Sequence, residues 1–394
     1  MAEKKQKHKQ DFINQHKKES NHHISWYNIL WSWQHWPGYR FVIIASFVAG
    51  LSVIVLLTSP LLKGETVPGA IKIASPAMVF AADEDENEEP LRYFRYIDGI
   101  EVYSDSENNR WPAGVMIENL LSVRPHYGLS DASVVYETLA ESGVTRFLVV
   151  YDGAGHDVPK IGPVRSARPY YLEWISEYDG LYAHAGGSPE ALQAISGLGI
   201  KAINGISSGY QYFWRDPTVG APHNLFTNSD QLGRALGDMG LLEKKPAYRP
   251  SLFKDDAPLE DRPVEDRVNP KIDFSSYSYE VRYEYDPDRN TYRRFNGGTE
   301  QVDANTKELL RVNNIVIVKV PEEIYLGEKG RINLNLTGEG ELLVFRDGVV
   351  IKGHWKKQSR DFRTEYFDSN GNEIYLNRGQ TWVEVVPGDR EVTY

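Results

Sequence analysis

An apolar run from Phe41 to Leu62 constrains this chain more than any other feature. It reads FVIIASFVAGLSVIVLLTSPLL and contains no charged residue. As a helix it would be about 33 Å long, enough to cross the hydrocarbon core of a bilayer. Residues 1–40 carry seven Lys or Arg against three Asp or Glu, whereas the rest of the chain carries 37 against 52. The positive-inside rule then predicts a basic, aromatic cytoplasmic tail over 1–40, one transmembrane helix over 41–62, and an extracytoplasmic body.

A cleaved secretory signal is the alternative explanation of the same run. Such signals have a shorter apolar core, and cleavage follows within a few residues. Here the small-residue stretch from Val79 to Ala82 lies well beyond the run. We therefore expect a retained anchor in the cell membrane, and late cleavage near Ala82 stays open.

The composition limits the chemistry of the body. The chain contains no cysteine, which excludes disulfides, a thiol nucleophile, a zinc–thiolate cluster and a lipidated cysteine. The excess of acidic residues beyond residue 62 argues against nucleic acid as a partner. We expect no cofactor, and any anionic ligand needs local Arg side chains or backbone donors.

Two polar segments divide the body. Residues 63–90 end in an acidic run and are expected to form a disordered linker. Residues 246–270 combine five prolines with alternating charges and predict a second linker. The division leaves one domain over 91–245 and another over 271–394.

The first domain is predicted to be α/β or α+β. Residues 134–140 and 144–153 have the composition of strands. Helices are expected over 170–178, 190–196 and 229–239. Ser188, Pro189 and Glu190 form a helix-start signal, and Thr227 with Asp230 resembles a capping box.

The second domain is predicted to be a small β-rich barrel or sandwich. Its segments are rich in β-branched and aromatic residues with alternating polarity. The pairs Asp347-Gly348 and Asn370-Gly371 separate such segments, which is a strong hairpin signal.

A pair of arginines marks the first candidate site. Arg165 and Arg168 lie in the turn IGPVRSARP, directly before a predicted helix. Guanidinium forks and exposed amides at a helix start suit a carboxylate or phosphate. The alternative is that both arginines pair with Glu137, Glu141 or Asp152.

Two further turns carry histidines ahead of helices. The first contains His184 and two glycines that let a ligand approach the backbone closely, and the second has a histidine beside an amide. Three polar turns preceding three helices favour a site at one end of an α/β sheet. The residues of these two turns are His184, Gly186, Gly187, Ser188, His223 and Asn224.

A lone histidine in an apolar strand is also a common core residue, and this alternative stays open for His184. A metal site is not predicted, because His126, His184, His223 and the nearby glutamates follow no metal-ligand spacing.

The runs RPHYGLSDASVVYETLAESGVTRFLVVYDG, IGPVRSARPYYLEWISEYDG, AHAGGSPEAL and PHNLFTN resemble the YerB-like family of bacterial envelope proteins. The ending GELLVFRDGVVIKGHWKK through GQTWVEVVPGD is similar too. The resemblance implies an exported protein with two modules of unassigned function over 91–394. Family members resemble lipoproteins, and this chain departs from them by lacking cysteine. The matching positions are Glu137, Thr145, Arg146, Arg165, Arg168, His184, Gly186, Gly187, Ser188, His223 and Asn224.

Two functional hypotheses follow. In the first, the ectodomain is a binding or scaffold module for a cell-wall glycan or an envelope partner, with Arg146, Arg165 and Arg168 in its cleft. In the second, it is an envelope hydrolase that cleaves a glycan or phosphodiester, with His184, His223 and Glu137 as catalytic groups. We favour binding, and whether the protein is an enzyme stays open.

Overall fold

The computed structural model describes residues 91–394, apart from 154–156, 322 and 326–329. These residues belong to one compact unit, Asn87–Tyr394. The predicted cytoplasmic tail, the run Phe41–Leu62 and the linker 63–90 lie outside the described residues.

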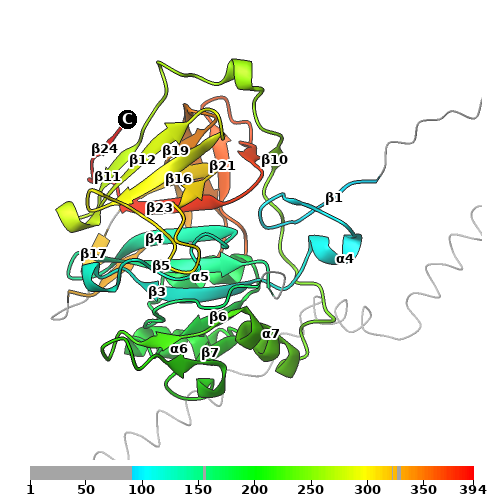
Figure 1. Ribbon diagram of the computed structural model, residues 1–394, viewed down its shortest axis with the longest axis vertical. Helices are drawn as coiled ribbons and strands as arrows, with labels where there is room; N and C mark the ends of the chain where they lie inside the picture. Colours follow the sequence, from blue (N-terminus) through cyan, green and yellow to red (C-terminus); the bar gives the residue numbers. More distant parts are fainter. Residues whose placement is uncertain (1–90, 154–156, 322, 326–329) are drawn as a thin grey trace, which may run out of the picture. The chain divides into compact units, whose positions relative to one another are not determined.

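A ten-stranded mixed sheet forms the centre of the unit (Figure 1). In spatial order its strands are β21 (Glu365–Asp368), β20 (Val349–Lys357), β19 (Gly338–Arg346), β16 (Asn314–Val320), β23 (Thr381–Pro387), β4 (Val134–Glu141), β5 (Val144–Tyr151), β3 (Ala113–Glu118), β6 (Leu181–His184) and β7 (Ala202–Asn204).

The sheet joins the two halves of the body through one strand pair. Strand β23 runs parallel to β4, with Thr381 opposite Val134 and Glu384 opposite Glu137. The central strands β3, β4, β5, β16 and β23 are buried along nearly their whole length. Such near-continuous apolar strands are expected where a sheet is covered on both faces.

The local sequence explains the hairpins. Ser142 and Gly143 connect β4 to β5, and both have positive φ (53° and 77°), as a two-residue hairpin turn requires. Asp347 and Gly348 connect β19 to β20 in the same way, with φ of 53° and 74°. The hairpin predicted at Asp347-Gly348 is confirmed.

A second, antiparallel sheet follows the polar segment 246–270. It contains β14 (Thr299–Glu300), β13 (Thr291–Asn296), β12 (Glu280–Asp286), β11 (Lys271–Asp273) and β24 (Val392–Thr393), and β15 (Arg311–Val312) pairs with β13. Burial alternates along β12, as expected for a strand with one face on the core.

The remaining strands form two-stranded pairs. These are β1 (Tyr93–Phe94) with β2 (Glu101–Val102), β8 (Trp214–Arg215) with β9 (Leu225–Phe226), β10 (Phe253–Lys254) with β22 (Leu376–Asn377), and β17 (Glu323–Tyr325) with β18 (Ile332–Leu334). Short 3-10 turns occupy Leu121–Val123, Tyr210–Tyr212, Leu259–Asp261 and Tyr277–Tyr279.

The described residues contain four α-helices: α4 (Asp105–Asn108), α5 (Tyr171–Glu177), α6 (Pro189–Gly197) and α7 (Ser229–Asp238). The Ser188 hydroxyl accepts a hydrogen bond from the Ala191 amide at 3.3 Å, so the predicted cap of α6 is confirmed. The predicted capping box of α7 is wrong. Asn228 is its cap, whereas Thr227 donates to the Tyr212 carbonyl.

The predicted fold class is also wrong. The described part is mostly β, with only four short α-helices among its residues, and β4 and β5 form an antiparallel hairpin. The later strands do not close into a barrel of their own, because β16, β19, β20, β21 and β23 extend the sheet of the first half. Whether 91–245 and 271–394 fold separately stays a prediction.

The anchor prediction receives no support from the helices that are described. Within 91–394, outside the three gaps, none of them is long and apolar enough to span a bilayer.

Candidate functional site

Glu118 is the centre of a polar cluster at the end of β3. The Arg165 guanidinium Nη2 lies 2.9 Å from Glu118 Oε1, and His223 Nδ1 lies 2.7 Å from Oε2. The carboxylate side chain is only 4% exposed, whereas those of Arg165 and His223 are 25% and 28% exposed. Two partly exposed groups are thus held by one buried carboxylate.

Three segments that are distant in the sequence form this cluster. The Arg165 amide donates to the Met116 carbonyl at 2.9 Å, which places the arginine turn beside β3. The Val164 amide donates to the Leu225 carbonyl at 2.7 Å, which places the His223 turn beside the arginine turn. Backbone pairing therefore fixes the spacing of the three side chains.

The cluster presents hydrogen-bonding groups to solvent. The contact to Glu118 uses Nδ1 of His223, so Nε2 is the ring nitrogen available for another partner. Among the residues described, no second partner is found for Nε2 or for the Arg165 guanidinium. The pair can therefore bind an anion, or the imidazole can exchange a proton with a ligand.

A second, separate cluster surrounds Glu141. Arg146 contacts Oε1 at 2.7 Å, and Arg168 contacts Oε2 at 2.7 Å. Although burial opposes it, the two guanidiniums hold the pKa of Glu141 below its usual value. Arg146 also donates to the Ser166 carbonyl and Arg168 to that of Ala167. For Arg168 the structure shows the ion pairing with Glu141 that the sequence left open.

His184 is buried. It is 2% exposed, its ring stacks on Tyr182 with centroids 5.2 Å apart, and Nδ1 contacts the Gly186 carbonyl at 2.7 Å. Burial lowers its pKa. These contacts are typical of a core histidine, which was the alternative.

The small residues after His184 shape the turn. Gly186 has φ of 67°, and a Cβ there would lie 2.7 Å from Ile206 Cδ1. Gly187 packs on Ala167, and Ser188 caps α6. In the third turn, the Asn224 amide oxygen accepts a hydrogen bond from Arg215 at 2.7 Å.

Glu137 is buried within the protein. Its Oε1 accepts hydrogen bonds from Thr145 at 2.6 Å and Asn119 at 3.0 Å, and its Oε2 pairs with Arg294. The side chains of Glu137, Arg294 and Glu384 are all 0% exposed. The Glu137 side chain has no surface that a substrate could contact in this structure, and its catalytic role stays a prediction.

The same buried network couples the two halves of the body. Arg294 also lies 3.6 Å from Glu384, and its guanidinium stacks over Trp382 at 4.1 Å. Burial and the nearby charge of Glu137 raise the pKa of Glu384 to about 8, despite the hydrogen bond from Tyr283.

The predicted convergence on one cleft is not what the structure shows. Arg165 and His223 share Glu118, Arg168 belongs to the Glu141 cluster, and His184 is packed in the core. Sequence reasoning missed Glu118, although a carboxylate that ends an apolar strand was a usable signal. Within the described ranges, no three His, Asp or Glu side chains are placed to hold a metal ion.

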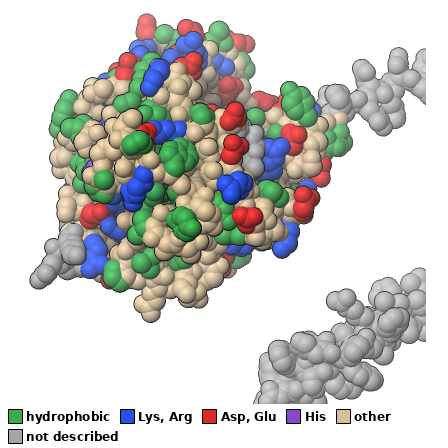
Figure 2. Space-filling view, turned by 60° about the horizontal axis from the view of Figure 1, so that its bottom comes forward, with side chains coloured by type: hydrophobic (Ala, Val, Ile, Leu, Met, Phe, Trp, Pro, Cys, Tyr) green, Lys and Arg blue, Asp and Glu red, His purple; other side chains and the backbone are tan. Residues whose placement is uncertain are grey.

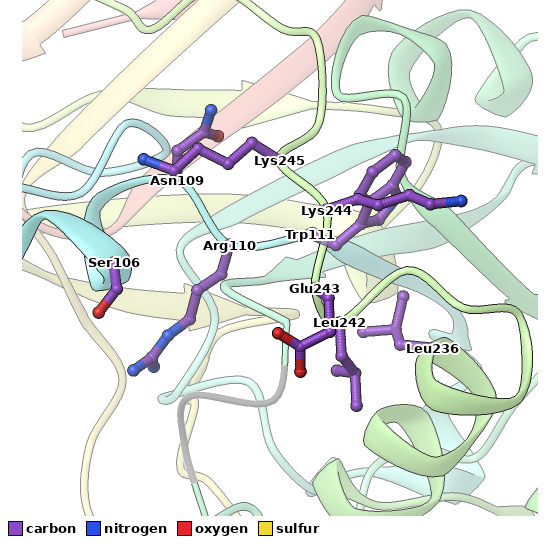
Figure 3. Close-up of a pocket in the computed structure, with 9 residues that line it drawn as sticks. All are labelled: Ser106, Asn109, Arg110, Trp111, Leu236, Leu242, Glu243, Lys244 and Lys245. Atoms are coloured by element: carbon purple, nitrogen blue, oxygen red, sulfur yellow. The ribbon is translucent and has the colours of Figure 1, made fainter.

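A hollow of about 420 Å³ lies elsewhere, between α4 and α7 (Figure 3). Arg110, Trp111, Glu243 and Lys244 contribute to its lining, which includes none of the predicted site residues. On the face shown in Figure 2, basic and acidic side chains are interspersed, so no broad area of one sign is available for binding.

Comparison with known proteins places the chain in a family. Residues 99–241 match the N-terminal domain, and residues 270–383 the C-terminal domain, of a protein of unknown function, DUF3048. "Putative lipoprotein YerB" of Bacillus subtilis (strain 168) is 30% identical over 281 residues, 71% of this chain and 82% of that protein. This chain belongs to the YerB-like family.

The fold agrees with a solved YerB-like structure. The crystal structure of YerB from Bacillus subtilis matches with a TM-score of 0.67 and 28% identity, over 76% of this chain and 99% of that one. The resemblance inferred from the sequence is therefore confirmed, including two modules of unassigned function.

The predicted single-pass localisation is corrected. The Bacillus relative is named a lipoprotein, which denotes a lipid and not a spanning helix. No spanning helix occurs in the part of the chain that the structure describes.

Proposed function

We propose that this YerB-like protein is an envelope-associated binding module that recognises an anionic group, a carboxylate or a phosphate, on a cell-wall glycan or envelope partner. The observation that carries the proposal is the Glu118 cluster, where Arg165 and His223 are held in place yet remain partly exposed. The envelope assignment is supported by the name of the Bacillus relative.

The electrostatics of the cluster favour local recognition. Glu118 fixes both partners, so little side-chain freedom is lost when a ligand binds. The Arg165 guanidinium and, when the ring is protonated, Nε2–H of the His223 imidazolium donate hydrogen bonds to the same anion, and charge-assisted bonds of this kind are the stronger ones. The chain has a net charge of −11, so attraction cannot come from bulk charge.

An envelope hydrolase is the second candidate, and the Glu118–His223 contact favours it. A carboxylate on Nδ1 orients an imidazole so that Nε2 acts as general base or acid. Arg165 would then stabilise negative charge that develops in the transition state.

The test incubates the purified protein with soluble fragments of cell-wall glycan. Retained fragments on the immobilised protein are expected for a binder, and shortened fragments in solution for a hydrolase. Arg165→Ala should weaken retention about 10- to 100-fold, the value of one charge-assisted contact. Arg289→Ala removes an exposed guanidinium from the other half of the body and is the matched control.

Equal retention by the wild type and Arg165→Ala would contradict binding at this cluster. Arg165→Lys should retain glycan fragments little better than Arg165→Ala does, because an ammonium does not reproduce the guanidinium fork. His223→Gln should abolish shortening of fragments if the protein is a hydrolase, and should weaken retention only partly if it is a binder.

A further inference from the structure

A second hollow lies where the two family segments meet. Its volume is about 260 Å³, and its lining includes Leu121, Arg124, Pro125, Asn296, Gln301 and Val302. The first three come from the N-terminal match and the others from the C-terminal match. The hollow shares no residue with the Glu118 cluster.

Arg124 is a half-buried cation without a carboxylate partner. Its Nε donates to Asn119 Oδ1 at 3.0 Å and its Nη2 to the Asn119 carbonyl at 3.2 Å. The Tyr279 ring lies 5.4 Å away. Across the described ranges, no Asp or Glu oxygen lies within 4 Å of this guanidinium. Burial of a charge is costly unless a counter-charge accompanies it.

The hydrogen-bond network leaves one donor and one acceptor unused at this hollow. Asn119 Nδ2 donates to Glu137 and Thr145, so its Oδ1 must be the acceptor. Asn296 Nδ2 donates to that oxygen at 3.2 Å, which directs the Asn296 Oδ1 away from it. Asn296 Oδ1 and Arg124 Nη1 are both shielded from solvent and have no partner within the described ranges. Asn296 itself is 3% exposed.

The charges around the hollow also do not balance. Arg124 and Arg294 contribute two positive charges, whereas Glu137 contributes one negative charge. Burial and the nearby charge of Glu137 raise the pKa of Glu384, which favours its neutral form. Glu300 lines the hollow too, but its Oε1 forms an ion pair with Arg293 Nη1 at 3.1 Å, so its charge is already matched. One positive charge therefore remains.

We propose that this hollow binds a small carboxylate that has an apolar body and a neighbouring N–H, as in an N-acylated amino acid or the C-terminal end of a peptide. The carboxylate pairs with Arg124 after a rotation of the guanidinium that turns the unpartnered Nη1 toward the hollow. The N–H donates to Asn296 Oδ1, and the apolar body packs on Leu121, Pro125 and Val302. The site is independent of the anion-binding function proposed for the Glu118 cluster.

The test uses calorimetric titration of the full-length protein with three small probes. N-acetyl-alanine carries all three features, N-acetyl-alaninamide lacks the charge, and isobutyrate lacks the N–H. We expect N-acetyl-alanine to bind at least tenfold more tightly than either of the others. Equal affinity for acid and amide, or no binding of the acid, would overturn the proposal.

A tripeptide that ends in alanine, with its amino group acetylated, distinguishes the two sources of this chemistry. Affinity equal to or above that of N-acetyl-alanine identifies a peptide end, and weaker binding identifies a free acid.

Variants locate the binding. Arg124→Gln should weaken N-acetyl-alanine binding at least tenfold, whereas Arg289→Gln should leave it unchanged. Thr299→Trp fills the hollow from its exposed rim without touching the buried network, so it tests the site even if Arg124→Gln does not fold. Full binding by Thr299→Trp would overturn the proposal.

Discussion

At the scale of single residues, buried charges distinguish this protein from an ordinary β core. Arg294 lies between Glu137 and Glu384 with no exposed surface on any of the three. Trp382 and Phe147 pack around the same guanidinium. Such a group is costly to desolvate. Removal of one partner leaves a buried charge unpaired and is strongly destabilising, whereas replacement of all the charged partners by apolar residues is often neutral.

Removal of Arg294 alone should therefore be severe. Arg294→Met leaves Glu137 buried without its partner, and we expect a loss of about 3–5 kcal/mol in the free energy of unfolding. The measurement is urea denaturation at neutral pH. Combining it with Glu137→Gln should recover part of the loss, because the orphaned charge is then gone. A double variant less stable than Arg294→Met would refute this explanation.

The raised pKa of Glu384 predicts a pH dependence of stability. The folded protein holds this proton more tightly than the unfolded chain, whose Glu titrates near pH 4.5. The stabilisation is thus complete below pH 4.5 and declines as pH rises toward 8, by up to about 1.4 kcal/mol per pH unit. In Glu384→Gln, the free energy of unfolding should fall less between pH 5 and pH 8. If the free energy of unfolding falls as much in Glu384→Gln as in the wild type, Glu384 does not titrate in this range.

At the scale of elements, local sequence signals determine where helices and hairpins start. Ser188 ends the turn after His184, and its hydroxyl is the cap of α6. The helix is largely exposed, so its stability depends on this end more than on packing. The cap also positions the turn that pairs with the arginine segment at Ala167.

Ser188→Ala should lower the free energy of unfolding by about 1 kcal/mol, the usual value of a lost N-cap. Ser188→Asp should retain most of that stability, because aspartate caps as well as serine does. Thermal melts of the three proteins provide the comparison. A loss as large in Ser188→Asp as in Ser188→Ala would mean that the hydroxyl has another role.

At the scale of the whole molecule, the β4–β23 pair joins the two family segments in one sheet. Both strands are buried, and the Glu137–Arg294 pair crosses the same boundary. A fragment of residues 91–245 would expose the whole edge of β4 to water. Unpaired edges of this kind are prone to aggregation.

We accordingly expect one cooperative unfolding transition for the described unit and none for the fragment 91–245 alone. Coincident transitions by tryptophan fluorescence and far-ultraviolet circular dichroism would support this. The fragment 271–394 is measured in the same assay, and we expect no cooperative transition for it either. Cooperative melting of either fragment would favour the independent domains that the proline-rich segment 246–270 predicts.

The sequence by itself determined the local elements and the family. The strands β4 and β5, the helices α5 to α7 and the turn at Asp347-Gly348 follow from periodicity, capping and turn residues, which act over a few positions. The same local signals marked the turns of Arg165 and His223 as candidate functional segments.

Only the tertiary structure decided which side chains meet. Glu118 rather than Glu137 receives Arg165 and His223, and Glu141 takes Arg168, because strand pairing across long sequence separations sets these distances. The same non-local pairing merged two apparent domains into one sheet through β4 and β23. Composition and spacing do not predict such partners, since any of several glutamates could pair with the same arginine.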